Sequence, residues 1–249
     1  WALARYDQPM KSAAVIGSAN PAPMRKGNGR LSRRASADRP KPTLRGVSHQ
    51  IAFFVTLLAG ALLVWRAPNV AARWSTAVYV ATVAALFGIS AVYHRPTWSV
   101  PARARMRRLD HSAIFLLIAG TYTPMALTLP AESANRMLAV AWIGGGLGIA
   151  RALFWVNAPK WLVAALALAM GWLAILYFPA IARVTSTWVV VYMLAGGIAY
   201  SIGAVIYALR RPDPWPRTFG YHEIFHALVI VGAACHFAAV VTALPAIRG

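Results

Sequence analysis

The chain has 249 residues, of which 59% belong to the hydrophobic class and only 12% are Asp, Glu, Lys or Arg. The charged share is about half of the roughly 25% typical of soluble domains, so the composition argues against a water-soluble fold and favours a membrane protein. A formal net charge of +19 can indicate a nucleic-acid partner. The basic residues, however, lie before the first apolar segment and in short gaps between apolar segments, which indicates basic cytoplasmic loops and not a nucleic-acid-binding surface.

The first part of the chain, residues 1–45, is basic and rich in Ser, Ala, Pro and Gly. We expect it to be a disordered cytoplasmic tail, followed by one transmembrane domain over residues 46–249. The single cysteine of the chain, Cys235, excludes an internal disulfide framework. Ten of the 25 Lys and Arg residues lie in this tail: Arg5, Lys11, Arg25, Lys26, Arg30, Arg33, Arg34, Arg39, Lys41 and Arg45.

Long segments without Asp, Glu, Lys or Arg predict the membrane spans, because a helix needs about 20 apolar residues to cross a bilayer. Six such segments are clear, and a seventh, weaker one covers 137–150 and continues after Arg151, whose long side chain can reach the headgroups. Short connections then predict an all-α polytopic membrane protein with seven helices in one bundle. The six clear segments are 46–65, 74–94, 111–131, 161–182, 184–209 and 224–247.

Basic residues in the connecting loops predict the orientation, because they are retained on the cytoplasmic side. We expect a cytoplasmic N-terminus and, with seven spans, an outer C-terminus. An inside N-terminus gives ten basic residues in inner loops: Arg95, Arg103, Arg105, Arg107, Arg108, Arg151, Lys160, Arg210, Arg211 and Arg217. It leaves five outside: Arg66, Arg73, Arg136, Arg183 and Arg248.

Ionisable residues at membrane depth are costly and therefore candidates for function. The alternation of the spans brings most of them to the cytoplasmic end of the predicted bundle. They are His49, His94, Asp110, His111, His222, Glu223, His226 and His236.

The histidine spacing predicts a metal site. His222 and His226 are four residues apart, so they share one face of a helix. With His94 they supply three imidazoles and leave a fourth position for water, the pattern of a catalytic zinc site. Asp110 would act on that water or orient a ligand, and Ser90, one turn before His94, would help to hold the water. The alternative is a set of interfacial histidines hydrogen-bonded to backbone or water.

Residues 222–226 also match H-E-x-x-H, in which Glu223 would be the general base of a metalloprotease. Such an enzyme needs a distal acidic ligand on another span. The candidates, Asp110 and Asp213, lack the asparagine- and glycine-rich context of intramembrane proteases. We keep this interpretation as a minor alternative.

Several motifs in order resemble the bacterial hemolysin III family, within the progestin and adipoQ receptor superfamily that includes the adiponectin receptors. The resemblance extends over about residues 41–245 and implies seven helices, an inner N-terminus and a zinc ion held by His94, His222 and His226. The motifs are Leu44–His49, Ser90–Arg95, Arg108–Ile114, Ala119–Pro124 and Gly220–His226.

The resemblance implies a multi-pass protein of a bacterial plasma membrane and two kinds of function. The first is a zinc-dependent hydrolase of a lipid amide, similar to a ceramidase, with Asp110 and Ser90 as catalytic residues and a membrane lipid as substrate. The second is a non-enzymatic regulator of membrane state, or a haemolytic pore-forming protein, in which zinc is structural.

Overall fold

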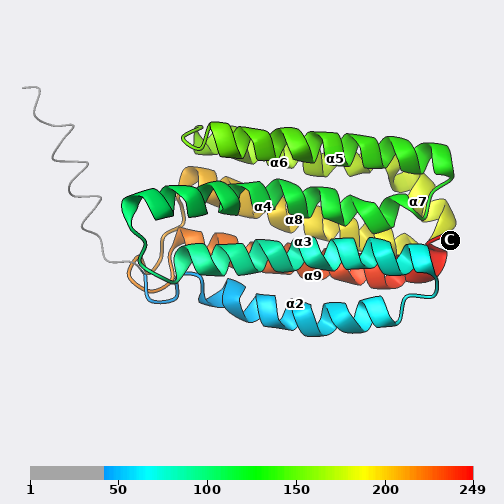
Figure 1. The fold of residues 1–249 in the computed structure, drawn as a ribbon, viewed down its shortest axis with the longest axis horizontal. Helices are drawn as coiled ribbons and strands as arrows, with labels where there is room; N and C mark the ends of the chain where they lie inside the picture. Colours follow the sequence, from blue (N-terminus) through cyan, green and yellow to red (C-terminus); the bar gives the residue numbers. More distant parts are fainter. Residues whose placement is uncertain (1–41, 249) are drawn as a thin grey trace, which may run out of the picture. The chain divides into compact units, whose positions relative to one another are not determined.

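The computed structural model describes residues 42–248, and helices make up nearly all of this part (Figure 1). The predicted all-α class is confirmed for these residues. Residues 1–41 of the predicted tail lie outside the described part. The helices are α2 (Val47–Trp65), α3 (Val70–His94), α4 (Val100–Ala126), α5 (Ala131–Phe154), α6 (Lys160–Trp172), α7 (Phe178–Val184), α8 (Thr187–Leu209) and α9 (Tyr221–Ala243), with 3-10 turns η1 (Leu173–Tyr177) and η2 (Leu244–Ala246).

Six helical segments in the described part are long and apolar enough to cross a membrane: Val47–Trp65, Val70–His94, Ala131–Phe154, Lys160–Val184, Thr187–Leu209 and Tyr221–Ala246. The segment around residues 137–156, which we expected to be the weakest, is among them as α5. Helix α4 is absent from this set although its length is sufficient, because its first turns carry the basic residues of 103–108 and its apolar part contains Asp110 and His111. A seventh span through α4 therefore stays a prediction.

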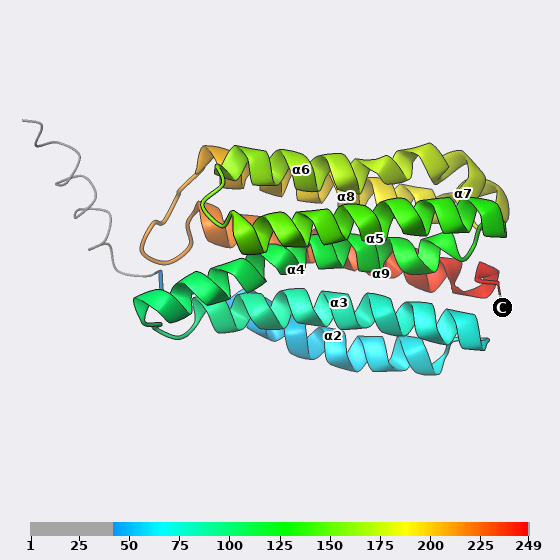
Figure 2. The same ribbon diagram turned by 45° about the horizontal axis from the view of Figure 1, so that its top comes forward.

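The long helices of residues 42–248 run side by side and alternate in direction (Figures 1 and 2). Each of α3, α4 and α5 packs against the helix before it in the sequence, and α9 packs against α2, α4 and α8. The ends of α3 and α5 and the starts of α2, α4, α6 and α9 consequently lie at the same end of the bundle (Figure 1). We call this the histidine end.

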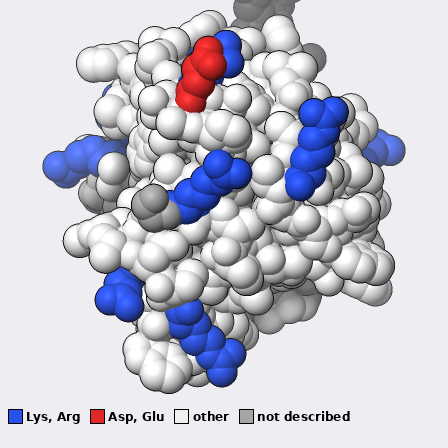
Figure 3. Space-filling view, turned by 90° about the vertical axis from the view of Figure 1, so that its right-hand side faces the viewer, with Lys and Arg blue, Asp and Glu red and all other residues white. Residues whose placement is uncertain are grey.

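The other end of the bundle carries scattered basic groups and one acidic group on a largely uncharged surface (Figure 3). Along the sides, large apolar residues are exposed, for example Leu58 at 80% and Ile143 at 65%. A soluble protein rarely leaves such residues exposed over every long helix, whereas a lipid-facing helix requires them. Fully buried side chains, among them Tyr79, Phe115, Met137 and Ile181, fill the interior.

Close helix packing at two glycines holds α4 between its neighbours. A Cβ at Gly120 would lie 2.0 Å from the Thr82 hydroxyl oxygen on α3, and a Cβ at Gly148 would lie 2.1 Å from the Phe115 ring. In a membrane the helices gain little from hydrophobic burial, so such close van der Waals contacts are a main source of association.

We predict that Gly148→Ala lowers the free energy of unfolding by about 1–3 kcal/mol, because the buried Phe115 ring must move. Gly146→Ala, a matched control on α5, meets no atom within 4 Å and should be neutral or stabilising by up to about 1 kcal/mol through helix propensity. Melting temperatures of the detergent-purified variants measure both. Equal melting of the two variants would show that the α4–α5 contact is not tight.

Candidate metal centre

Three histidines meet at the histidine end of the bundle. His94 is the last residue of α3, while His222 and His226 occupy the first two turns of α9. One ring nitrogen from each lies within 4.8 Å of those of the other two, and His94 and His226 are 8% and 2% exposed. The i, i+4 spacing on α9 places its two rings on one face, and the opposite directions of α3 and α9 bring the third ring to them.

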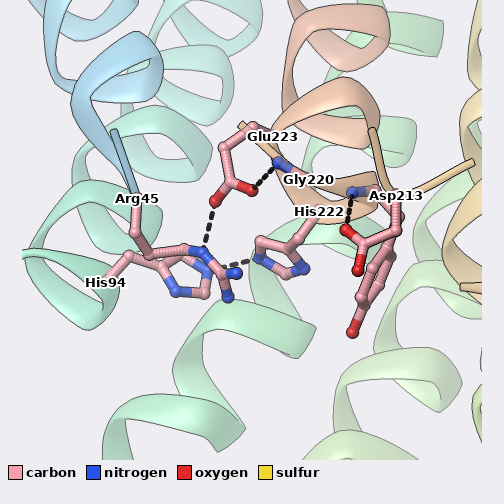
Figure 4. Close-up of polar contacts among 7 residues, drawn as sticks. Arg45, His94, Asp213, Gly220, His222 and Glu223 are labelled. Carbon is pink, nitrogen blue, oxygen red and sulfur yellow. Dashed lines mark hydrogen bonds and ion pairs between the residues drawn. The ribbon is translucent and has the colours of Figure 1, made fainter. Parts of the chain in front are cut away.

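The ring nitrogens of this cluster fit a cation. The Nε2 atoms of His94 and His222 face each other at 3.1 Å (Figure 4), so they require a shared proton or a shared cation between them. Nδ1 of His226 is buried without a hydrogen-bond partner. Buried polar atoms are rarely left unsatisfied, and three converging imidazoles are a donor set suited to zinc.

A fourth histidine supports the cluster from α2. The ring of His49 stacks on His226 with 3.8 Å between centroids and meets Phe87 edge-on at 5.0 Å. His49 is 2% exposed, and neither of its ring nitrogens has a hydrogen-bond partner. The sequence placed His49 at this end of the bundle but did not predict this stacking.

The start of α2 is held against the cluster by a glycine. Gly46 caps α2 with a φ of 78°, in the left-handed region that glycine adopts without strain. A Cβ at this position would lie 2.8 Å from Cβ of His94. Gly46 therefore permits both the backbone turn and the close approach of α2 to His94.

Glu223 is engaged in holding helices together and does not point at the cluster as a base would. One carboxylate oxygen pairs with the Arg45 guanidinium, and the other accepts a hydrogen bond from the Gly220 amide at 2.9 Å (Figure 4). The carboxylate thus caps α9 and ties its start to the segment before α2. Sequence reasoning assigned Arg45 to the tail and missed this contact.

Asp213 also serves as a cap. Its Oδ1 accepts a hydrogen bond of 3.0 Å from the Tyr221 amide at the start of α9 (Figure 4). Carboxylates at helix N-termini are stabilised by the free amides and the helix dipole. Glu223 within the H-E-x-x-H motif and Asp213 before it therefore both serve to cap the start of α9.

Asp110 and Ser90 come together beside the cluster. Ser90 lies one turn before His94 on α3 and is 3% exposed, and its side chain interacts with the Asp110 carboxyl group on α4 by hydrogen bonding. Tyr207 of α8 interacts electrostatically with Asp110, and its ring centroid lies 6.0 Å from that of His222. The structure thus brings together all five residues that the sequence selected.

A lysine and two tyrosines form the border of the site, and sequence reasoning missed them. Nζ of Lys160 lies 4.3 Å from the Tyr207 ring centroid and 5.5 Å from that of Tyr221, both within the range of cation–π attraction. Both tyrosines are neighbours of His222. Residues 160, 207 and 221 all lie near the predicted cytoplasmic end of a span. This shared position is the one sequence signal that could have predicted that they lie together.

The fold and this cluster define a class, that of polytopic helical membrane proteins with a histidine-rich site at one end of the bundle. A family model described as Haemolysin-III related matches residues 37–237. The chain therefore belongs to the hemolysin III family, within the adiponectin receptor-like superfamily, as the sequence motifs predicted.

Three relatives illustrate this membership. The "Hemolysin-3 homolog" of Bacillus subtilis is 29% identical over 77% of this chain and 88% of its own length. "Hemolysin-3" of Bacillus cereus is 36% identical over 52% of this chain and 57% of its own length. The "Heptahelical transmembrane protein ADIPOR2" of rice is 31% identical over 68% of this chain and 81% of its own length.

We predict that Glu223→Gln lowers the free energy of unfolding by about 1–3 kcal/mol, because the buried carboxylate loses its charge pairing with Arg45 while the Gly220 cap remains. Arg45→Gln should cost a similar amount, and the double variant should cost less than the sum of the two, because both changes remove one interaction. Melting temperatures give the three values. Metal content should stay at the parent level in all variants; its loss in Glu223→Gln would contradict the structural role of Glu223.

Proposed function

We propose that this protein is a zinc-dependent hydrolase that cleaves an amide bond of a membrane lipid. The observation that carries the proposal is the convergence of three imidazoles beside the Asp110–Ser90 pair, with Nδ1 of His226 buried without a hydrogen-bond partner. A structural metal site is normally closed by a fourth protein ligand, whereas three protein ligands leave a position for substrate or water.

The zinc ligands are His94, His222 and His226. When bound, the ion supplies Lewis acidity that polarises a carbonyl group and eases the deprotonation of water. His49 stacks on His226 and holds that ring in place for the ion. Because all three imidazoles must be neutral to bind a cation, occupancy falls at acidic pH.

Asp110 is the residue that moves the proton. Its carboxyl group accepts the proton of the attacking water as general base and returns it to the amine that leaves, so that the amide C–N bond breaks as a C–O bond forms. Ser90 donates to Asp110 and fixes the orientation of the carboxylate.

Glu223 is not the base in this proposal. Its two oxygens are engaged with Arg45 and the Gly220 amide, which removes the support for an H-E-x-x-H metalloprotease. The match to that motif follows from two separate needs of α9, a pair of ring ligands at i, i+4 and a capping carboxylate at the third helical position.

The proposal includes the membrane topology. Seven spans, with α4 as the seventh, place the histidine end in the cytoplasm of a bacterium and the C-terminus outside its plasma membrane. Support comes from the position of α4 between α3 and α5, from the excess of basic loop residues at the histidine end, and from the name "Heptahelical" of a rice relative. A site at the headgroup level can meet the amide of a lipid that remains in the bilayer.

A second candidate function is cytolysis or regulation of membrane state, with structural zinc. It is favoured by the name "Hemolysin-3" of a Bacillus cereus relative. It requires no turnover, and in its pore-forming version it requires leakage of vesicle contents.

We predict that Asp110→Asn lowers kcat for ceramide hydrolysis by about 10²–10⁴-fold while zinc content is retained, because the variant loses the general base and keeps all three ligands. Ser90→Ala should cause a smaller loss. Turnover is measured on N-acyl sphingosine with the purified full chain in lipid vesicles.

Glu132→Gln, an exposed acidic residue at the other end of the bundle, is the control and should retain parent turnover. Undiminished turnover in Asp110→Asn would refute the assignment of the base. The same vesicles loaded with a fluorescent dye test the second candidate: leakage that depends on the protein, without lipid hydrolysis, would favour a pore.

A further inference from the structure

A row of polar and basic groups on α4 beside the histidine cluster has no role in the proposed reaction. Residues 107, 108, 111 and 112 recur at helical spacing, so they share one face of α4. Atoms from all four are buried without a hydrogen-bond partner: Nε of Arg107 and Arg108, Nδ1 of His111, and Oγ of Ser112. Asp110 lies about 100° around the helix from His111, on the side that faces Ser90 of α3.

Arg151 of α5 faces this row. Gly148, one turn earlier, lies against the Phe115 ring, and because α4 and α5 run in opposite directions, the next turn of α5 comes opposite His111 and Ser112. The guanidinium carbon of Arg151 lies 5.5 Å from the Phe115 ring centroid, and Arg151 interacts electrostatically with His111. All three guanidinium nitrogens of Arg151 are buried without a hydrogen-bond partner.

In the described part of the chain, no carboxylate forms an ion pair with Arg107 or Arg151. Within residues 42–248 the ion pairs are Arg45–Glu223 and Arg136–Glu132. Arg107 has partners for one terminal nitrogen only, the Val156 carbonyl at 2.8 Å and the Asn157 side chain. A shielded guanidinium without an acceptor is unfavourable, so the cluster is complete only with an anion.

The donor groups of this cluster and its depth in the membrane indicate which kind of anion it binds. Guanidinium groups bind phosphate oxygens through paired N–H donors, and a hydroxyl and an imidazole beside them add further donors. Phe154, Trp155 and Trp161 next to the cluster are 89%, 53% and 65% exposed, and exposed tryptophans near helix ends mark the headgroup layer. Basic pockets between helices at this depth are typical binding sites for anionic lipid headgroups.

We propose that Arg107, His111, Ser112 and Arg151 form a binding site for the phosphate group of an anionic membrane lipid, between the start of α4 and the end of α5. The lipid supplies the missing acceptor, and its acyl chains lie along the exposed apolar surface of α5. Binding there ties α4, which carries Asp110, to α5.

The test uses the detergent-purified full chain and its melting temperature with added phosphatidylglycerol, phosphatidylcholine or inorganic phosphate. Phosphatidylglycerol at about a hundredfold excess over its Kd should raise the melting temperature of the parent by roughly 5–10 °C. Arg151→Gln should remove most of this rise. Arg136→Gln, the same change on the same helix at the exposed, opposite end, should keep it.

Without added lipid, Arg151→Gln should melt no lower than the parent, because it removes a shielded charge that the protein does not pair. If that variant fails to fold, Ser112→Ala serves instead and should lose part of the rise. An equal rise in the parent and in a folded Arg151→Gln or Ser112→Ala chain would overturn the site. An equal rise with phosphatidylcholine would overturn the preference for an anion, and an equal, Arg151-dependent rise with inorganic phosphate alone would overturn the lipid as its source.

Discussion

Neutral imidazoles that face each other in a buried site need a cation or a proton between them, and the histidine end of this protein is arranged around that need. The i, i+4 spacing of His222 and His226 places two of the rings on one face of α9. The third ring, His94, lies beside them because α3 ends where α9 begins. Gly46 lets α2 approach His94, and the Arg45–Glu223 pair fixes the start of α9. If α9 shifted by one turn, all of these contacts would be lost together.

Helix α4 connects the two polar regions of this end. Asp110 extends from α4 toward Ser90 beside the histidine cluster, and neighbouring residues of α4 are those that we propose bind a lipid phosphate. Both depend on tight packing at glycines, Gly120 against α3 and Gly148 against α5. These same polar residues lower the apolar character of α4, so α4 is not among the six segments that are apolar enough to cross a membrane.

The sequence predicted the helices and the meeting of His94, His222 and His226 at one end of the bundle, because both depend on simple spacing. Apolar length predicts a span, and alternation of spans predicts which residues share an end. Contacts that depend on side-chain direction could not be predicted: the stacking of His49 on His226, the pairing of Arg45 with Glu223, and Lys160 over Tyr207. The sequence also ranked the spans imperfectly: α5 is more apolar than expected, and α4 is less so. An Arg near the end of α5 costs little, whereas Asp110 and His111 lower the apolar character of α4.

The most direct test of the central claim is the metal content of the purified protein, measured by elemental analysis beside the His222→Ala/His226→Ala double variant. A His236→Ala chain is the control, because that ring stacks on Tyr200 and lies far along α9 from the cluster. The account predicts about one zinc ion per chain in the parent and in the control, and its loss in the double variant. A well-folded parent without zinc would contradict the account and reduce the cluster to buried histidines that share protons.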